Sequence, residues 1–492
     1  MPAGFTAADF YYILPEILLT IGALLVLVVN LLFPKRDSFV FGVTLVTLGV
    51  TGVSVLGFAG VDTTASAGLL AVDGFSTFFK LMFLLSAVIT VLMSAPYLRV
   101  ELIQAGEYYF LIICATLGMM FMASGIDLIT LFIGLETMAV SFYILVGFIK
   151  PNQRSNEAAV KYFLLGAFSL GILLYGMSLF YGVTGTTSLH GIADALAGSD
   201  QTLLLQLALI LVIAGMGFKI AAVPFHMWAP DVYEGAPTPV TAFLSVGSKA
   251  ASFAMLLRIL VEALPSLVND WQLIFWVLAA VTMTVGNIAA ITQSNIKRML
   301  AYSSIAHAGY VLIGVVAATE RGITATMVYL WVYLFMQLGA FAIVAMLRRK
   351  DVVGDELKDF SGLYLRQPFA AVAMLVFLMS LGGIPPTAGF MGKFWIFSAA
   401  IESGFVWLAV IGVVNSAISL YYYIRVVVFM WMKEEVTESP IPILPSMAVA
   451  LGIAIAGSLF FGIFPQPLFD QAQTAAEALG LSAPAAASVT LH

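Results

Sequence analysis

Charged residues are scarce in this chain of 492 residues. Only 10% of its residues are Asp, Glu, Lys or Arg, whereas 61% are hydrophobic, and its mean hydropathy is +1.04. A soluble domain carries roughly 25% charged residues, which keep its surface in water. The low charge therefore excludes a soluble globular protein and predicts a protein that crosses a membrane many times.

Cysteine is almost absent as well. The single Cys114 excludes an internal disulfide, and the sequence has no Cys cluster or CxxC pair that could hold a zinc ion or an iron-sulfur centre. The glycine-rich stretch 382–392 lacks the strand, turn and helix order of a nucleotide site. We therefore expect no cofactor in this chain and no nucleic-acid partner, and we place any redox chemistry in other proteins.

Long apolar stretches are what the sequence has instead. A bilayer core takes about 20 apolar residues per helix, and windows of that length predict 14 spans. They run near 11–32, 39–59, 75–95, 107–124, 127–149, 157–181, 203–228, 239–261, 271–292, 299–318, 324–347, 369–400, 405–430 and 443–464. The first span is not a signal peptide, because no basic region precedes it. We predict an all-α integral membrane protein with about 14 transmembrane helices and no soluble domain.

The basic residues between the spans predict the orientation of the chain. If residue 1 lies outside the cell, the opposite loops hold only Arg321, and thirteen basic residues face the cytoplasm. These are Lys35, Arg36, Arg99, Lys150, Arg154, Lys297, Arg298, Arg348, Arg349, Lys350, Lys358, Arg366 and Lys433. Since the number of spans is even, we expect both termini on the outer, periplasmic side.

Seven of the 21 basic residues lie inside the spans: Lys80, Lys161, Lys219, Lys249, Arg258, Lys393 and Arg425. Lys80 and Arg258 are close enough to span ends that we expect them to reach the lipid headgroups. The lysines at 219, 249 and 393 have no short route to water, and Glu136 lies near the middle of span 5. Each charge at the membrane centre costs about 2.5–3.5 kcal/mol. Four of them indicate a function rather than a gain in stability.

Proton transfer is the function that these charges favour. A buried pair of Glu136 with one lysine would serve helix packing, but it would leave the other lysines unmatched. Desolvation disfavours their charged form, so at least one can gain and lose a proton near neutral pH. His226, seven residues from Lys219, and His307 in "SSIAHAGYVLIG" are each commonly core histidines. Histidine is nevertheless a natural proton carrier between such lysines.

Prolines break two of the predicted helices next to these lysines. Pro224 lies five residues after Lys219, and "GGIPPTAG" lies upstream of Lys393. Proline has no N–H to donate to the preceding turn, so it leaves backbone carbonyls free. Here the freed carbonyls are those of Ile220, Leu381 and Gly382. Such carbonyls are tolerated in a membrane only against protein or water, and broken helices build ion sites in transporters. We expect water at the breaks in spans 7 and 12.

An internal repeat relates the two halves of the chain. A shift of five spans pairs Glu136 with His307, Lys219 with Lys393 and Lys249 with Arg425, at offsets of 171, 174 and 176 residues. Five is odd, so the two units, spans 4–8 and 9–13, are expected to be inverted relative to each other. This predicts a three-helix segment at 1–106, repeats at 107–261 and 271–430, and a last helix with a tail at 431–492.

Three motifs carry a resemblance to a known family. They are "FKIAAVPFHMWAPDVYEGAPTPVTAFLSVGSKAA", "NIKRMLAYSSIAHAGY" and "GGIPPTAGFMGKFWIF". Together they resemble the antiporter-like proton-channel subunits of complex I, the respiratory NADH-quinone oxidoreductase, over essentially the whole chain. The N type fits best, because the M type has glutamate where Lys393 stands and the L type continues into a lateral helix. This chain ends about 28 residues after its last span.

The resemblance implies residue roles and partners. Glu136 is similar to the span-5 glutamate that holds the charge of Lys219, Lys249 to the central lysine, and Lys393 to the lysine that passes the proton outward. Lys161 matches a lysine toward the cytoplasmic side of span 6. The implied partners are M-type and K-type membrane subunits of a bacterial cytoplasmic (inner) membrane, with FMN and iron-sulfur clusters in other subunits. The resemblance implies that electron transfer from NADH to quinone in those other subunits drives proton movement through this chain.

Other functions remain open from the residues alone. A cation/proton antiporter of the Mrp type shares the implied fold and would transport sodium. An inverted-repeat solute transporter would need a substrate pocket at the helix breaks. A haem carrier that used His226 and His307 would show the absorption of bound haem.

Overall fold

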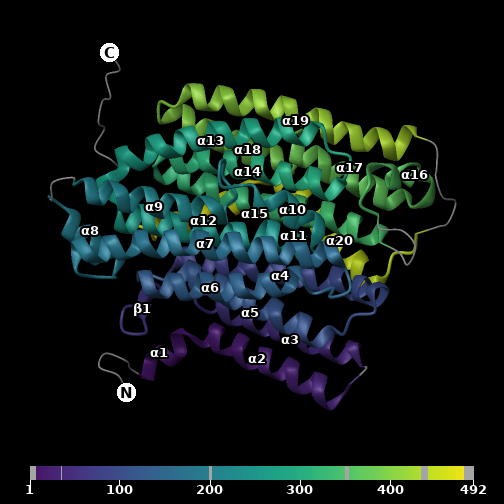
Figure 1. The fold of residues 1–492 in the computed structure, drawn as a ribbon, viewed down its shortest axis with the longest axis horizontal. Helices are drawn as coiled ribbons and strands as arrows, with labels where there is room; N and C mark the ends of the chain where they lie inside the picture. The colour runs from purple at the N-terminus through teal and green to yellow at the C-terminus, as the bar shows by residue number, and fades with distance from the viewer. Residues whose placement is uncertain (1–6, 35, 199–201, 349–353, 434–440, 481–492) are drawn as a thin grey trace.

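The computed structural model describes residues 7–34, 36–198, 202–348, 354–433 and 441–480. Almost all of them are helical, and the described strands are β1 (Thr63–Ala65) and β2 (Leu70–Val72), which pair as an antiparallel hairpin. Figure 1 shows the long helices side by side along one direction, with β1 and α8 at one end of the bundle and α16 at the other. The predicted all-α class is confirmed.

Twelve continuous helical segments are long and apolar enough to cross a membrane. They are α2 (Leu14–Leu32), α3 (Asp37–Leu56), α4 (Gly74–Glu101), α5 (Ala105–Ser124), α6 (Leu128–Val146), α7 (Gln153–Thr184), Thr238–Ala263, Pro265–Ile291, α14 (Ile296–Ala317), α15 (Glu320–Leu347), α19 (Val406–Met432) and α20 (Pro445–Ile463). The segment at 238–263 is composite and comprises α11 (Thr238–Phe243), η1 (Leu244–Ser248), α12 (Lys249–Arg258) and η2 (Ile259–Ala263). The segment at 265–291 comprises η3 (Pro265–Leu267) and α13 (Val268–Ile291).

Two further crossings are broken helices. The first consists of α9 (Leu203–Lys219) and α10 (Trp228–Gly235), and the second of α17 (Pro368–Gly382) and α18 (Ala388–Glu402). They take the seventh and twelfth places in the order of crossings. The prediction of about 14 transmembrane helices with breaks in spans 7 and 12 is therefore confirmed. The repeat boundaries and the inversion of the two units stay predictions.

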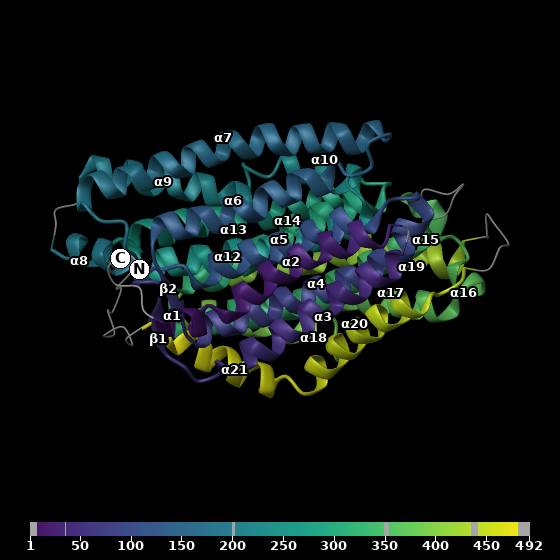
Figure 2. The same cartoon turned by 90° about the horizontal axis from the view of Figure 1, so that it is seen from below.

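Short helices lie between and beyond the crossings. Between crossings are α8 (Leu189–Leu196), η4 (Leu357–Phe360) and α16 (Leu363–Arg366), whereas α1 (Ala7–Tyr12) precedes the first crossing and α21 (Gln466–Glu477) follows the last. Figure 2 shows α21 along one face of the bundle, where it packs against α4 and α15. Helix ends differ from the predicted spans by a few residues: α1 ends at Tyr12 and α2 begins only at Leu14, inside the first predicted span.

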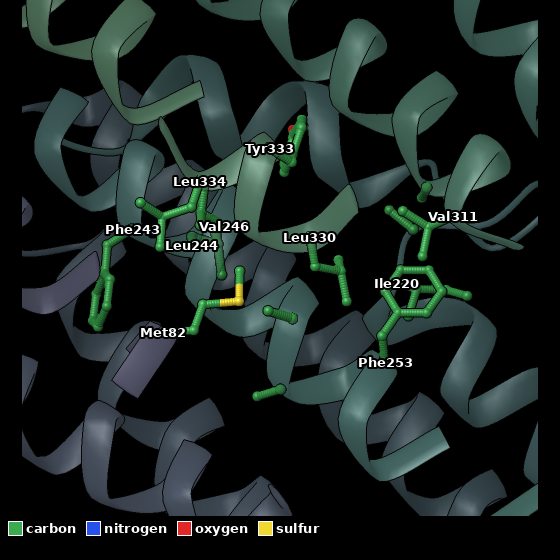
Figure 3. Close-up of a cluster of buried hydrophobic side chains, with 14 of the residues drawn as sticks. Met82, Ile220, Phe243, Leu244, Val246, Phe253, Val311, Leu330, Tyr333 and Leu334 are labelled. Atoms are coloured by element: carbon green, nitrogen blue, oxygen red, sulfur yellow. The ribbon is translucent and has the colours of Figure 1, made fainter. Parts of the chain in front are cut away.

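Three crossings form the centre of the bundle. Protein covers the whole apolar window of Thr238–Ala263 and 94% of the windows of α14 and α15, but only 33% of those of α2, α3, α7 and α20. Figure 3 shows part of this centre, where Leu334 of α15 lies beside Leu244 and Val246 of η1. Polar side chains on these three crossings therefore face protein or internal water rather than lipid.

Local backbone chemistry explains the second break. Gly383 follows α17 with a φ of +82°, a left-handed conformation that glycine adopts without strain. A Cβ at this position would lie 2.9 Å from Cδ of Lys393. Pro385 and Pro386 then offer no N–H with which to continue the helix. The chain therefore turns at the place where the Lys393 side chain passes.

Candidate functional site

Lys249 occupies a buried site at the centre of the bundle. It is the first residue of α12 and follows the π-helical turn η1, a distortion that is frequent at functional sites. Its Nζ donates to the carbonyl and the hydroxyl oxygen of Ser304, each at 2.6 Å. Tyr333 of α15 donates to the same hydroxyl at 2.8 Å. Among the described side chains, no carboxylate lies within ion-pair distance of this amine, so only neutral groups hold it.

His307 lies on α14, one turn from Ser304, and is buried. Its Nδ1 is 2.7 Å from the hydroxyl of Tyr329, and its Nε2 is 3.2 Å from the hydroxyl of Tyr423. A tyrosine hydroxyl can donate or accept, so either tautomer of the ring can be satisfied. His307 is therefore one turn of α14 from the contact of Lys249, and its role as a proton carrier stays a prediction.

Lys393 lies on α18 against the end of α17. Its Nζ donates to the carbonyls of Leu381 and Gly382, at 2.9 and 3.0 Å, and to the hydroxyl of Ser416 at 2.8 Å. These are the carbonyls that the prolines were predicted to free. The negative end of the α17 dipole also favours the ammonium form of Lys393. The ring of Tyr310, which lies on α14 like His307, is 4.8 Å from the same Nζ.

Lys219 ends α9 and is buried, but it forms no direct ion pair with Glu136 within the described chain. Its Nζ lies 3.5 Å from the hydroxyl of Tyr143. Glu136 on α6 is only half-buried, and its Oε1 has no hydrogen-bond partner. The two charges are close enough to interact electrostatically. The expected pair is therefore a through-space interaction, with Tyr143 as the contact of Lys219.

His226 lies in the first break, between α9 and α10, and its role in proton transfer stays a prediction. His226 is half-buried, and its Nδ1 is buried without a hydrogen-bond partner. The backbone of the break is held instead by Thr282 of α13, which accepts from the Val223 amide at 3.0 Å, and by the Trp228 indole, which donates to Phe218 O at 2.9 Å. In the described structure no hydrogen bond joins His226 to a lysine.

Lys161 lies at the protein surface, with 42% of its side chain exposed, whereas Lys219, Lys249 and Lys393 are buried. Its Nζ pairs with Glu157 at 2.7 Å and with Asp231 of α10 at 2.8 Å. Arg298 of α14 reaches Asp231 at 2.7 Å and Glu234 at 3.1 Å. Asp231 thus joins α7, α10 and α14. The sequence contains no clear signal for Asp231, although it lies in the first turn of α10, after the first break.

The structure corrects the expectation for Lys80 and Arg258, which do not extend to the headgroups. Both are buried. The Nζ of Lys80 lies 2.7 Å from Glu16 of α2. Arg258 binds Asp73, at the start of α4, at 2.8 Å and also binds Glu262. The position of Lys80 and Arg258 along their own spans could not predict these partners, because Glu16 lies on α2 and Asp73 at the start of α4, away from the helix of the residue that each one binds.

Arg425 has a structural partner as well. Its guanidinium donates to the carbonyls of Ile291 and Gln293, at 3.0 and 3.2 Å. These carbonyls lie at the end of α13, where the helix dipole is negative. Arg425 therefore caps α13 and does not reach the buried lysines, although the repeat pairs it with Lys249.

Several tyrosines and serines of the site were not predicted. They are Tyr143, Ser303, Ser304, Tyr329, Tyr333 and Tyr423. Ser303 and Ser304 precede His307 by four and three residues in the motif "SSIAHAGY", so helical periodicity places them on its face. The tyrosines come from three other helices, and their approach depends on packing that one sequence does not show.

A charged cavity of about 290 Å³ opens where α4 ends and α11 and α14 begin. We call it the Asp355 cavity; Glu101, Thr238, Lys297, Arg348 and Asp355 line it. Burial raises the pKa of Asp355, and Lys297 and Arg348 oppose this effect. Arg348 also binds Glu101. In the described chain, no group of three or more His, Cys, Asp or Glu side chains is placed to hold a metal ion.

A family model and a similar protein sequence both relate this chain to NADH-quinone oxidoreductase. Residues 125–419 match the family model "NADH:quinone oxidoreductase/Mrp antiporter, TM". The chain is similar to NADH-quinone oxidoreductase subunit N of Trichlorobacter lovleyi, with 46% identity over 477 residues that cover 96% of this chain and 98% of the relative.

Solved structures share the fold. A chain of respiratory complex I from Thermus thermophilus with bound aureothin is 35% identical, with a TM-score of 0.79 over 93% of this chain and 98% of that one. A chain of the Mrp complex from Dietzia has a TM-score of 0.83 over 96% of this chain and 98% of that one. Its identity of 22% supports the fold alone.

Proposed function

Because the chain belongs to the family of NADH-quinone oxidoreductase subunit N, we propose that it moves protons across the membrane through a line of buried residues. The line runs from Lys219 through Lys249 and His307 to Lys393. Electron transfer from NADH to quinone in other subunits of the respiratory complex supplies the energy. FMN and iron-sulfur clusters belong to those subunits.

The buried amine of Lys249 carries this proposal. Only neutral oxygens surround it, so nothing fixes its proton by a counter-charge. In a low dielectric, a nearby charge changes the affinity of such an amine strongly. A change of charge at Lys219, which Glu136 influences, then makes Lys249 take up or release a proton. Such electrostatic coupling needs no redox group in this chain.

Lys393 is the acceptor on the far side of this line. The carbonyls of α17 and the Ser416 hydroxyl give its ammonium form three hydrogen bonds. His307 and its tyrosine partners lie on or against α14 and link the surroundings of the two lysines. Where direct hydrogen bonds are missing, ordered water completes the path. The position of Lys161 on the surface, paired with Asp231, suits proton collection rather than the central step.

Neighbouring membrane subunits cover Glu136. The helix α6 exposes Ile133, Val140 and Ile144 on the side where Glu136 lies half-buried. A carboxylate facing lipid at mid-membrane depth is costly, and such groups face protein or water. We assign this face to an M-type or K-type neighbour of the same complex.

The membrane is the bacterial cytoplasmic (inner) membrane, with both termini on the periplasmic side. The excess of loop lysines and arginines supports this orientation. Three of those residues, Lys35, Arg349 and Lys350, lie outside the described residues. The Asp355 cavity is then on the cytoplasmic side, at the end of the bundle where α16 lies.

A Lys249→Ala substitution tests the proposal. We expect NADH-driven proton uptake into inverted membrane vesicles to be lost, while native gels show normal assembly of the oxidoreductase. Lys150→Ala is the matched control, because Lys150 is exposed in a loop. Equal proton uptake by both variants contradicts the proposal. Sodium transport by the isolated chain would favour an antiporter of the Mrp type instead.

A further inference from the structure

A cavity of about 340 Å³ lies where α3, α5 and α20 begin and α4 ends. A second cavity of about 380 Å³ shares Asp37, Leu98 and Arg99 with it and therefore adjoins it. We call the two together the α3–α20 cavity. Spaces of this size hold small molecules. Because the ends of membrane-spanning helices lie at the level of the lipid headgroups, this cavity lies where the bilayer changes from hydrocarbon to polar groups.

Two opposite charges line the α3–α20 cavity without pairing. Asp37 begins α3 and Arg99 lies in the last turn of α4, and both are exposed. Within the described chain, neither side chain forms an ion pair with the other or with a third residue. Both act electrostatically on the hydroxyl of Tyr109 of α5, which also lines the cavity. A guanidinium matches a phosphate, and a carboxylate accepts hydrogen bonds from an ammonium group. The cavity therefore suits a ligand that carries both groups.

An apolar stripe on α4 leads from this cavity into the membrane. Leu81, Leu85 and Val88 are only partly buried, and Ala95 lines the cavity. They are spaced by four, three and seven residues, so they share one face of the helix. From Leu85 to Ala95 the helix rises about 15 Å at 1.5 Å per residue, which is half of the roughly 30 Å hydrocarbon core. The stripe therefore matches the depth of one lipid leaflet.

The helix α3 leaves open space along this stripe. Both α3 and α20 pack against α4, and Figure 2 shows the three helices on the same side of the bundle. Ser38 of α3 lines the cavity, and Gly42 and Gly49 follow it by four and eleven residues, on the same face. A Cβ at either glycine would meet nothing within 4 Å. An extended apolar chain has room beside these glycines.

We propose that the α3–α20 cavity binds one glycerophospholipid whose headgroup carries a primary amine, as in phosphatidylethanolamine. The phosphate binds Arg99, the ammonium group binds Asp37, and one acyl chain lies along the stripe of α4 between α3 and α20. A headgroup without an amine leaves Asp37 beside a like charge, and a choline headgroup has no N–H to donate. Binding of this lipid does not depend on proton transfer through the buried lysines.

Photolabelling of the intact oxidoreductase tests the headgroup contacts. The complex is reconstituted with a phosphatidylethanolamine analogue that carries a photoreactive group in its acyl chain, and mass spectrometry identifies the labelled peptides. We expect labelling of α4 in the wild type and a roughly tenfold loss in Arg99→Ala, because a charge-assisted hydrogen bond to phosphate disappears. Lys433→Ala is the control, because Lys433 is exposed but lines neither part of the cavity.

Two further variants test the amine and the acyl chain. Unlabelled phosphatidylethanolamine should compete with the analogue better than phosphatidylcholine does, and Asp37→Asn should abolish this preference. Gly49→Leu keeps both charges and fills the open space beside the stripe, so it should reduce labelling of α4 as strongly as Arg99→Ala does. Gly171→Leu on α7 is its matched control, because Gly171 also has open space around it.

Either of two results overturns the inference. One is equal labelling of α4 in the wild type, Arg99→Ala and Gly49→Leu, which would mean that lipid touches this face without a specific site. The other is a cryo-EM map of the intact wild-type complex that shows a segment of a neighbouring subunit, or phosphate alone, between Arg99 and Asp37. The map decides the matter even if the variants do not assemble.

Discussion

The buried lysines of this protein differ in the groups that contact their amines. Lys249 is held by neutral oxygens, Lys393 by the end of a helix, and Lys80 by a carboxylate. Burial is similar for all three. A counter-ion fixes a proton on lysine, whereas neutral partners leave its affinity open to changes nearby. The partner, more than depth in the membrane, therefore separates a structural lysine from one suited to proton transfer.

Glu136 allows a test at this scale. Glu136→Gln removes a charge that interacts with Lys219 through space, so Lys219 is expected to lose its proton more readily. NADH-driven proton uptake in vesicles should fall. Glu136→Asp keeps the charge and should retain much of the activity. A Glu136→Gln variant with normal turnover and normal proton uptake would show that the carboxylate serves packing alone.

The broken helices are the elements that build the site. The end of α17 turns its last carbonyls toward Lys393, and the end of α9 carries Lys219 itself. A continuous helix would use these carbonyls within its own backbone. The break thus converts backbone groups into ligands for an ammonium group, at a depth where lipid offers none.

Gly383→Ala tests the second break. Alanine at a φ of +82° costs about 1 kcal/mol, and its Cβ would lie 2.9 Å from Cδ of Lys393. We expect both lower thermal stability and lower proton uptake. Gly404→Ala is the matched control, because Gly404 has a φ of +86° and open space around it. Equal loss of uptake in the two variants would mean that backbone strain alone matters.

At the scale of the whole molecule, buried ion pairs join distant helices. Glu16 and Lys80 link α2 to α4, and Arg258 links α12 to the start of α4 through Asp73. Removing one partner of a buried pair leaves an uncompensated charge. The first pair holds two of the N-terminal crossings together, and the second holds the start of α4 against α12.

Lys80→Met should therefore destabilise the assembled subunit by about 3–5 kcal/mol, because Glu16 stays buried and unpaired. The double variant Glu16→Leu with Lys80→Met should recover most of this loss, since apolar side chains then fill the site. Thermal unfolding of the purified complex, followed on native gels, measures both. Losses that simply add in the double variant would show that the pair contributes no coupling.

The sequence alone determined the class and the broad plan of this protein. Apolar stretches of membrane-spanning length and scarce charge predict the fourteen crossings, because a bilayer accepts little else. Prolines beside Lys219 and Lys393 predict the two breaks, since proline cannot donate to the preceding turn. Both signals are local, and the structure agrees with both. The motifs around Lys249 and His307 also identified the family.

Tertiary structure decided which charges meet. Glu16 is 64 residues from Lys80, and Asp73 is 185 residues from Arg258. The sequence therefore predicted that both basic side chains reach the lipid headgroups, whereas packing brings a carboxylate to each of them. Packing likewise left Glu136 near Lys219 without a direct ion pair, gave Lys219 the hydroxyl of Tyr143, and placed Tyr329 and Tyr423 on His307. Hydropathy fixes how deep a residue lies along a helix. Which face of that helix meets which neighbour depends on the fit of all the side chains together, and no single stretch of sequence contains that information.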